Sequence, residues 1–182
     1  AMAVARFLRR VPLVQIYAST LRRCQETARP LAETNVARPA VISSDLLMET
    51  ALGVLEGESK DRQSTAELTE YYRSFSKDEI HYRVPDGENL HDVADRVGRF
   101  FVDQAELLKR PGTHLIVGHR NVNKMILKHL LGLSFEEGLH IEQENQRLYL
   151  YFDGPKELWS CWLEGRTAQL TLGCATTDDS YA

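Results

Sequence analysis

The chain has 182 residues, of which 43% are hydrophobic and 26% charged, and its formal net charge is −4. Its length and apolar content suffice to bury one sizeable core, so a single domain is expected over residues 1–174. The slightly negative net charge does not indicate a basic surface for binding nucleic acid. No apolar run approaches the roughly 20 residues that a helix needs to cross a bilayer. We therefore expect a globular protein without nucleic-acid or membrane partners.

The cysteine pattern does not indicate a disulfide framework or a metal site. Cys24, Cys161 and Cys174 are odd in number, widely spaced and free of metal-type spacing. Cysteines without a disulfide pattern are typical of proteins in a reducing compartment, so a cytoplasmic location is expected.

The first third of the chain predicts a helix, a strand and a second helix. Residues 1–11 place Val4, Phe7, Leu8 and Val11 on one helical face, as in the back half of an amphipathic helix. The run "LVQIYAS" at 13–19 is typical of a strand, and residues 20–35 have helical composition. A brief extended start and a glycine-punctuated loop are expected over 41–57.

The rest of the chain alternates further helices with strands. Ser64 and Glu67 have the spacing of a capping box, which predicts a helix start at "STAELTEYYRSF". The further segments are predicted as one long helix over 88–110, a buried strand "HLIV" at 114–117, a helix over 121–131 that ends before Gly132, strands "QRLYLYF", "LWSCWL" and "AQLTL", and a disordered polar tail at 175–182.

This alternation predicts an α/β fold, arranged as a three-layer sandwich around a mainly parallel central sheet. Ligands of such sheets lie at the carboxyl ends of the strands.

Two strand-to-helix junctions carry polar groups suited to an anion. Ser19 ends the first strand and Arg23 lies in the first turn of the next helix, while His119 follows "HLIVG" and precedes a helix. Helix N-termini offer free N–H groups, and an arginine fork binds phosphate oxygens in pairs. Taken singly, His119 could be a structural residue, and Arg22 is as good a candidate as Arg23. Glu49 could be a solvated loop carboxylate, and Glu88 could offset a helix dipole.

Four segments, taken in order, favour a functional role for these residues over a structural one: "STLRRCQETA", "LLMETALGVLEG", "PDGENLHDVADRV" and "LIVGHRNVNKMILKHLLG". Together, over about residues 3–152, they resemble the later motifs of the histidine phosphatase superfamily, the phosphoglycerate mutase-like family. The first segment departs from the family pattern at Cys24 and Glu26, and Arg120 stands where the family normally has glycine, a change that could alter what enters the site.

The resemblance implies a phosphomonoester hydrolase that acts through a phosphohistidine, without metal or cofactor, on a small phosphorylated metabolite. It selects Arg23 over Arg22 as a phosphate ligand, makes His119 a second ligand, and adds Glu88 to the phosphate-binding set. Glu49 becomes the candidate general acid. A phosphoglycerate mutase-type phosphotransferase is the alternative, although the short segment between Gly57 and Pro85 favours a phosphatase.

One motif that the resemblance implies is absent from the printed sequence. The family's nucleophilic histidine lies in an Arg-His-Gly motif at the end of the first strand, and no such motif occurs in these residues. The helical pattern at the start leads us to expect upstream residues that carry this strand and loop. The alternative is a pseudoenzyme that binds phosphate without turnover. A homodimer, paired through "RLYLYF" at a sheet edge, is a further candidate arrangement.

Overall fold

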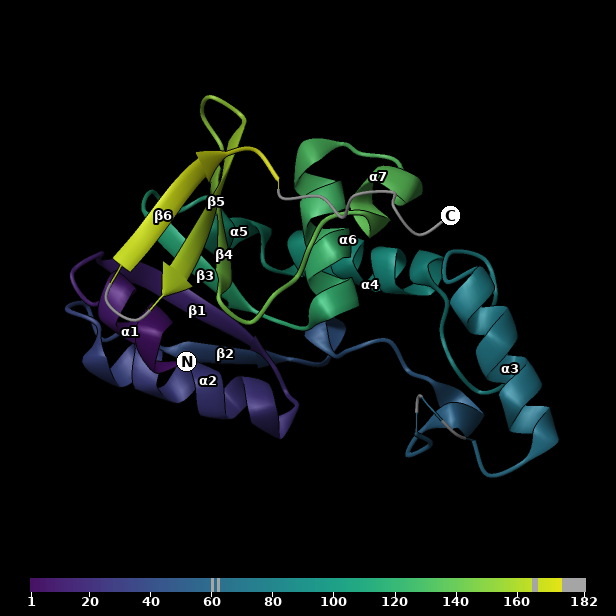
Figure 1. Ribbon diagram of the computed structural model, residues 1–182. Coiled ribbons are helices and arrows are strands. Elements are labelled where there is room, and N and C mark those ends of the chain that lie inside the picture. The colour runs from purple at the N-terminus through teal and green to yellow at the C-terminus, as the bar shows by residue number, and fades with distance from the viewer. Residues whose placement is uncertain (60, 62, 165–166, 175–182) are drawn as a thin grey trace.

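The computed structural model describes residues 1–59, 61, 63–164 and 167–174, and it contains a helix-flanked parallel sheet beside a separate antiparallel sheet (Figure 1). The predicted tail at 175–182 lies outside the described residues. Among the helices of the described part, none is long and apolar enough to cross a membrane.

The parallel sheet has three strands, with the first strand of the chain in the middle. Its order is β2-β1-β3, with both pairings parallel. The strands are β1 (Leu13–Ser19), β2 (Val41–Ser44) and β3 (Thr113–Val117). Because a parallel pair needs a crossover connection, helical segments separate these strands in sequence. The predicted α/β class with a parallel sheet is confirmed.

Helices cover both faces of this sheet, which gives the three layers. Their bounds are α1 (Met2–Leu8), α2 (Arg22–Thr34), α3 (Ala66–Lys77), α4 (Leu90–Asp103), α5 (Ala105–Leu108), α6 (Arg120–Leu131) and α7 (Phe135–Leu139), with 3₁₀ turns η1 (Asp45–Leu47) and η2 (Gly53–Leu55). Ile16 and Ala18 of β1 pack in one core with α1 and α2, whereas Tyr17, between them, packs in another with α4 and α6. This alternation follows from the two-residue period of a strand.

The last three strands form their own antiparallel sheet of order β4-β5-β6. They are β4 (Arg147–Phe152), β5 (Glu157–Glu164) and β6 (Thr167–Leu172), as the sequence predicted. Leu148 of β4 packs against the α1–α2 core, and Leu158 of β5 packs with Leu127 of α6. Within the described residues, no ladder joins this sheet to the parallel one. β4 is an edge strand, and the predicted homodimer stays a prediction.

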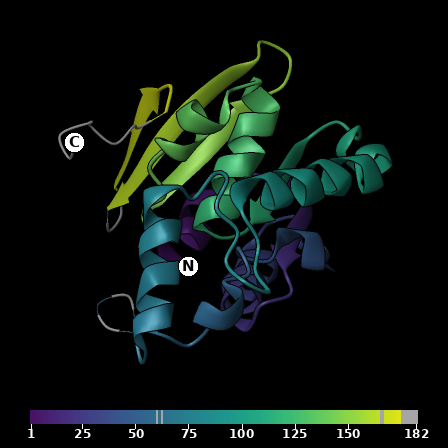
Figure 2. The same cartoon turned by 90° about the vertical axis from the view of Figure 1, so that its right-hand side faces the viewer.

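The start of α3 differs from the expected capping box. Thr65 is the N-cap and accepts a hydrogen bond from the Leu68 N–H group, while the Ser64 hydroxyl donates to Glu58 at 2.8 Å. The prediction of Ser64 as the cap was therefore wrong by one residue. The helix has no fully buried residue and stands away from the parallel sheet (Figures 1 and 2).

The long helix predicted over 88–110 is broken into two. α4 ends at Asp103, and Gln104 leaves helical geometry before the short α5 begins. At the other end, Asn89 caps α4 in a capping box with Asp92. Glu88 consequently lies before the helix and not in its first turn.

Candidate active site

The carboxyl ends of β1 and β3 bring Ser19 and His119 together. The two strands are parallel, with Ala18 opposite Val117, so the residues that follow them leave the sheet at the same edge. The Ser19 Oγ atom lies 2.8 Å from the His119 Nε2 atom. Both residues are buried, with 0% and 7% exposure, although they are 100 positions apart.

Arg23 fixes the protonation pattern of the His119 ring. The Arg23 Nε–H group donates to His119 Nδ1 at 3.0 Å. Arginine can only donate, so Nδ1 carries no proton in this contact. In the neutral ring, the proton is then on Nε2, which donates to the Ser19 hydroxyl. Arg22 instead pairs with Glu26 at 2.6 Å, and 90% of its side chain is exposed. Of the two adjacent arginines, Arg23 is the one that contacts His119.

His119 is held in its neutral form. Burial lowers its pKa to about 4, and the charges of Arg23 and Arg96 add to that effect. A neutral imidazole offers a hydrogen-bond donor without a fixed charge. The cation in direct contact with His119 is Arg23, whereas Arg96 is paired with Glu88.

This pKa predicts that folding stability falls in mild acid. Below about pH 6.5 the unfolded chain protonates His119 while the folded chain does not, so stability rises with pH from about 4 to 6.5. The loss at the acid end is on the order of 3 kcal/mol. Urea unfolding across this range should show a steeper pH dependence for the natural chain than for His119→Gln. Equal slopes would contradict the depressed pKa.

Cys24 packs against the same histidine from α2. Its thiol donates to the Gly118 carbonyl oxygen at 3.2 Å, and its sulfur lies 3.4 Å from His119 Nε2. Burial raises the pKa of this thiol, and the Glu49 charge raises it further against the lowering effect of Arg23. Cys24 is therefore a protonated, buried packing partner of His119. The sequence marked this residue only as a departure from a motif.

Glu49 approaches the site from the loop between η1 and η2. Its carboxylate accepts a hydrogen bond from the N–H group of Thr50 at 3.0 Å. Asn121, in the first turn of α6, donates to the Thr50 hydroxyl at 3.3 Å, so α6 is tied to the loop that bears Glu49. The Glu49 charge raises the pKa of both the Cys24 thiol and the Lys124 amine, although in each case other causes are larger. Its role as general acid stays a prediction.

Glu88 binds a buried arginine that the sequence analysis did not single out. Arg96 of α4 meets both Glu88 oxygens, at 2.9 and 3.1 Å, and donates to the Leu46 carbonyl oxygen. Glu88 also accepts from the Ala51 N–H group at 3.0 Å. The Glu88–Arg96 ion pair thus connects the loop that bears Glu49 to α4. The phosphate-binding role of Glu88 stays a prediction. Arg96 could have been identified from the sequence, because it lies on the apolar face of a predicted helix, where a charged side chain needs a buried partner.

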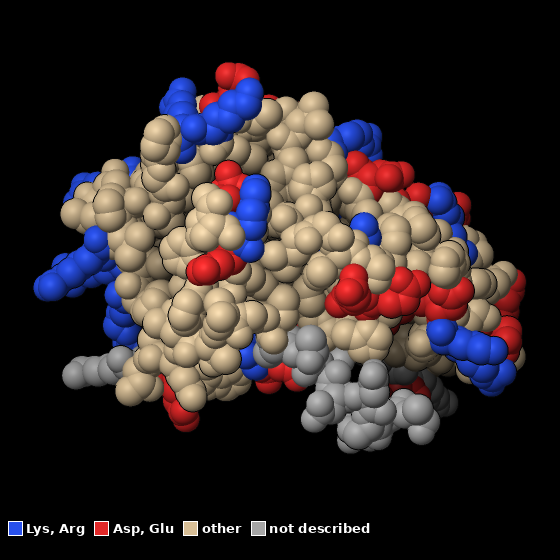
Figure 3. Space-filling model, turned by 90° about the horizontal axis from the view of Figure 1, so that it is seen from above, with Lys and Arg blue, Asp and Glu red and all other residues tan. Residues whose placement is uncertain are grey.

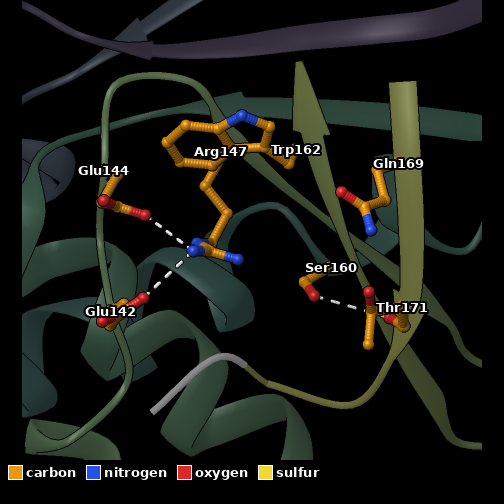
Figure 4. Close-up of a pocket in the computed structure, with 7 residues that line it drawn as sticks. All are labelled: Glu142, Glu144, Arg147, Ser160, Trp162, Gln169 and Thr171. Carbon is orange, nitrogen blue, oxygen red and sulfur yellow. Dashed lines mark hydrogen bonds and ion pairs between the residues drawn. The ribbon is translucent and has the colours of Figure 1, made fainter. Parts of the chain in front are cut away.

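A cavity of about 430 Å³ opens on the antiparallel sheet, away from the strand ends that bear Ser19 and His119 (Figure 4). Arg147 enters it from β4 and pairs with Glu142 at 3.0 Å and Glu144 at 2.6 Å, while its guanidinium lies 5.3 Å from the Trp162 ring centroid. Two carboxylates against one guanidinium leave this cavity net negative. It is a poorer place for a phosphate than the strand ends.

Basic side chains do not form a continuous stripe on the face that Figure 3 shows, where they lie in separate groups. The absence of a nucleic-acid partner stays a prediction. In the described part of the chain, no group of three or more His, Cys, Asp or Glu side chains is placed to hold a metal ion.

A parallel sheet covered by helices, with an arginine–histidine pair at its carboxyl edge, defines an α/β protein with a candidate anion site at that edge. The family model described as "Histidine phosphatase superfamily (branch 1)" matches residues 1–157. The chain therefore belongs to the histidine phosphatase superfamily, as its motifs predicted.

Individual relatives agree with this assignment. A 2,3-bisphosphoglycerate-dependent phosphoglycerate mutase from Methanosarcina acetivorans is 28% identical over 114 residues, which cover 60% of this chain and 44% of the relative. The match thus spans less than half of that protein.

Two solved structures show the same fold. A protein from Escherichia coli K-12 assigned as an alpha-ribazole-5'-P phosphatase has a TM-score of 0.71 and 21% identity, covering 95% of this chain and 78% of that one. A mycobacterial glucosyl-3-phosphoglycerate phosphatase has a TM-score of 0.61 and 19% identity, covering 96% and 82%.

Proposed function

We propose that this protein is a phosphatase of the histidine phosphatase type that acts on a small phosphate ester. The observation that carries the proposal is the contact of Arg23 with His119 at the carboxyl ends of β1 and β3, beside Ser19. A transferring phosphoryl group bears charge on its equatorial oxygens. The terminal N–H groups of Arg23 supply donors for those oxygens. The single N–H group of neutral His119 donates to Ser19 in this structure, so it must turn from the serine to reach a phosphate. Neither donor requires a metal ion.

The nucleophile of the proposed phosphohistidine step is not among the histidines of the printed sequence. His81, His91, His129 and His140 are exposed, in or beside other helices. His114 lies near the amino end of β3, at the opposite end from the site. The proposed phosphohistidine step therefore needs a histidine that none of these five positions supplies. A protein that binds phosphate without turnover is the second candidate, and it needs only the groups described above.

A mutase-type phosphotransferase is the third candidate, favoured by the match to the phosphoglycerate mutase. The segment from Gly57 to Pro85, which contains α3, is short, and this supports a phosphatase instead. The cytoplasmic location also stays a proposal.

Hydrolysis of p-nitrophenyl phosphate in the presence of a chelator tests the proposal. We would compare the 182-residue chain with a product of the same gene that includes any residues encoded upstream, and measure phosphate binding of both by calorimetry. Turnover by either form supports a metal-independent phosphatase. Phosphate binding without turnover in both supports the binding protein, and no binding by either refutes the site.

A further inference from the structure

The cavity on the antiparallel sheet takes no part in the proposed phosphate chemistry. It opens on one face of β4, β5 and β6 (Figure 4). Strand pairing places its sheet residues in two rows: Arg147, Trp162 and Gln169 in the first, and Ser160 with Thr171 in the second. Further along this face, Leu158 of β5 packs with Leu127 of α6. The face is therefore covered at one end and hollow at the other.

Arg147 lies in this cavity with its orientation fixed. Its Nη2 group donates to Glu142 at 3.0 Å and to Glu144 at 2.6 Å. The guanidinium carbon lies 5.3 Å from the Trp162 ring centroid, within the range of a cation–π contact. Only 15% of the arginine side chain is exposed. A ligand that binds here would not have to order a flexible side chain, which lowers the entropic cost of binding.

The same arginine has donors that the described residues do not use. Its Nε atom is buried and has no hydrogen-bond partner among them. Its Nη1 atom takes part in none of the hydrogen bonds or ion pairs within the described part of the chain. Figure 4 shows the guanidinium between the two glutamates on one side and Gln169, Ser160 and Thr171 on the other. Because buried donors are nearly always paired, an arginine with unused donors at a cavity wall suits an acceptor group of a ligand.

The wall opposite Arg147 carries groups that both donate and accept. Gln169 contributes an amide, and Ser160 and Thr171 contribute hydroxyls, of which that of Ser160 makes only a long contact of 3.5 Å with the Thr171 carbonyl oxygen. An anion here would meet the carboxylates beside Arg147, and a cation would meet the guanidinium. A neutral ligand with several hydroxyl groups can donate to the carboxylates and accept from Arg147 at the same time.

We propose that this cavity binds a neutral polyhydroxylated ligand, a sugar or sugar alcohol, between Arg147 and the polar side chains of β5 and β6. The volume of about 430 Å³ falls within the usual range of small-molecule pockets, roughly 300 to 1,000 Å³. The Trp162 ring at the wall offers an apolar surface to the C–H groups of such a ligand. The site is separate from the Arg23–His119 pair, so the proposal does not depend on phosphatase activity.

Tryptophan fluorescence of the whole chain tests the proposal. The sequence has two tryptophans, and Trp159 lies three positions before Trp162 on β5, on the opposite face of the strand. In a Trp159→Phe variant, Trp162 alone reports on the cavity. We expect at least one of glucose, trehalose and xylitol to give a saturable change in this signal, with a Kd of about 1 to 10 mM.

Two further substitutions in the Trp159→Phe variant separate the cavity from its surroundings. Gln169→Ala removes a lining amide and should weaken binding of that ligand about three- to tenfold. Thr167→Ala changes a side chain on the same face of β6 that does not line the cavity, and it should leave binding unchanged. Equal affinities in both variants would overturn the proposal, because they would place the ligand elsewhere.

The choice of ligand class has its own test. Glucose 6-phosphate should bind at the Trp162 reporter more weakly than glucose, because its charge meets Glu142 and Glu144. Tighter binding of the phosphate would overturn the proposal, since the cavity would then select an anion. The absence of a saturable change with all three neutral ligands up to about 100 mM would overturn it as well.

Discussion

Replacing Arg23 with alanine is expected to lower turnover in an active form of the protein by about 10²- to 10³-fold, and to weaken phosphate binding in parallel. Arg23 supplies the positive charge at a site whose histidine is neutral. Its Nε–H group also holds His119 Nδ1 at 3.0 Å, so the substitution frees the ring that donates to Ser19. Calorimetry with inorganic phosphate measures the first effect, and p-nitrophenyl phosphate hydrolysis the second.

Two variants distinguish this role from a general effect of charge. Arg22→Ala removes an adjacent arginine that pairs with Glu26 and should change phosphate binding little. Arg23→Lys keeps the charge but loses the planar fork, so it should recover only part of the binding. Removing Arg23 should also raise the His119 pKa, although burial, its larger cause, keeps that pKa below 6.5. Similar losses in Arg22→Ala and Arg23→Ala would contradict the specific assignment.

Much of the fold was predictable because its signals are local. The β-branched run at β1 and the period of α4 and α6 gave elements close to those observed. The break at Gln104 and the Thr65 cap were not predicted, because helix ends depend on competing hydrogen bonds such as that from Ser64 to Glu58. Nor did the sequence predict that the last three strands pair only with one another, since strand pairing is a non-local choice.

The candidate site was partly predictable for a similar reason. Strand ends of a parallel sheet meet at one edge, so the sequence alone predicts that Ser19 and His119 lie together. The contacts of Cys24 with His119 and of Arg96 with Glu88 depend on how α2 and α4 pack, and no short spacing in the sequence encodes them. The short helix α7 was missed as well, although Ser134 and Glu137 have the spacing of its capping box.

Replacing Glu49 with glutamine is expected to produce a loss that depends on the leaving group. An alkoxide needs a proton as it departs, and a general acid contributes about 10²- to 10⁴-fold, whereas p-nitrophenolate leaves without one. In an active form of the protein, hydrolysis of glycerol 3-phosphate should therefore fall by that factor, while hydrolysis of p-nitrophenyl phosphate changes little. Glutamine keeps the size of the side chain and an oxygen able to accept from the Thr50 N–H group.

The same substitution elsewhere in the loop separates proton donation from loop disturbance. Glu56 is exposed and accepts a hydrogen bond from the Leu52 N–H group at 2.8 Å. Glu56→Gln should affect both substrates alike and only slightly. If Glu49→Gln lowered both rates equally, Glu49 would act by positioning the loop that Asn121 and Glu88 hold, and the proton would have to come from another group. A loss in kcat confined to the alkyl ester supports proton transfer, because both esters present the same phosphoryl group to Arg23 and His119.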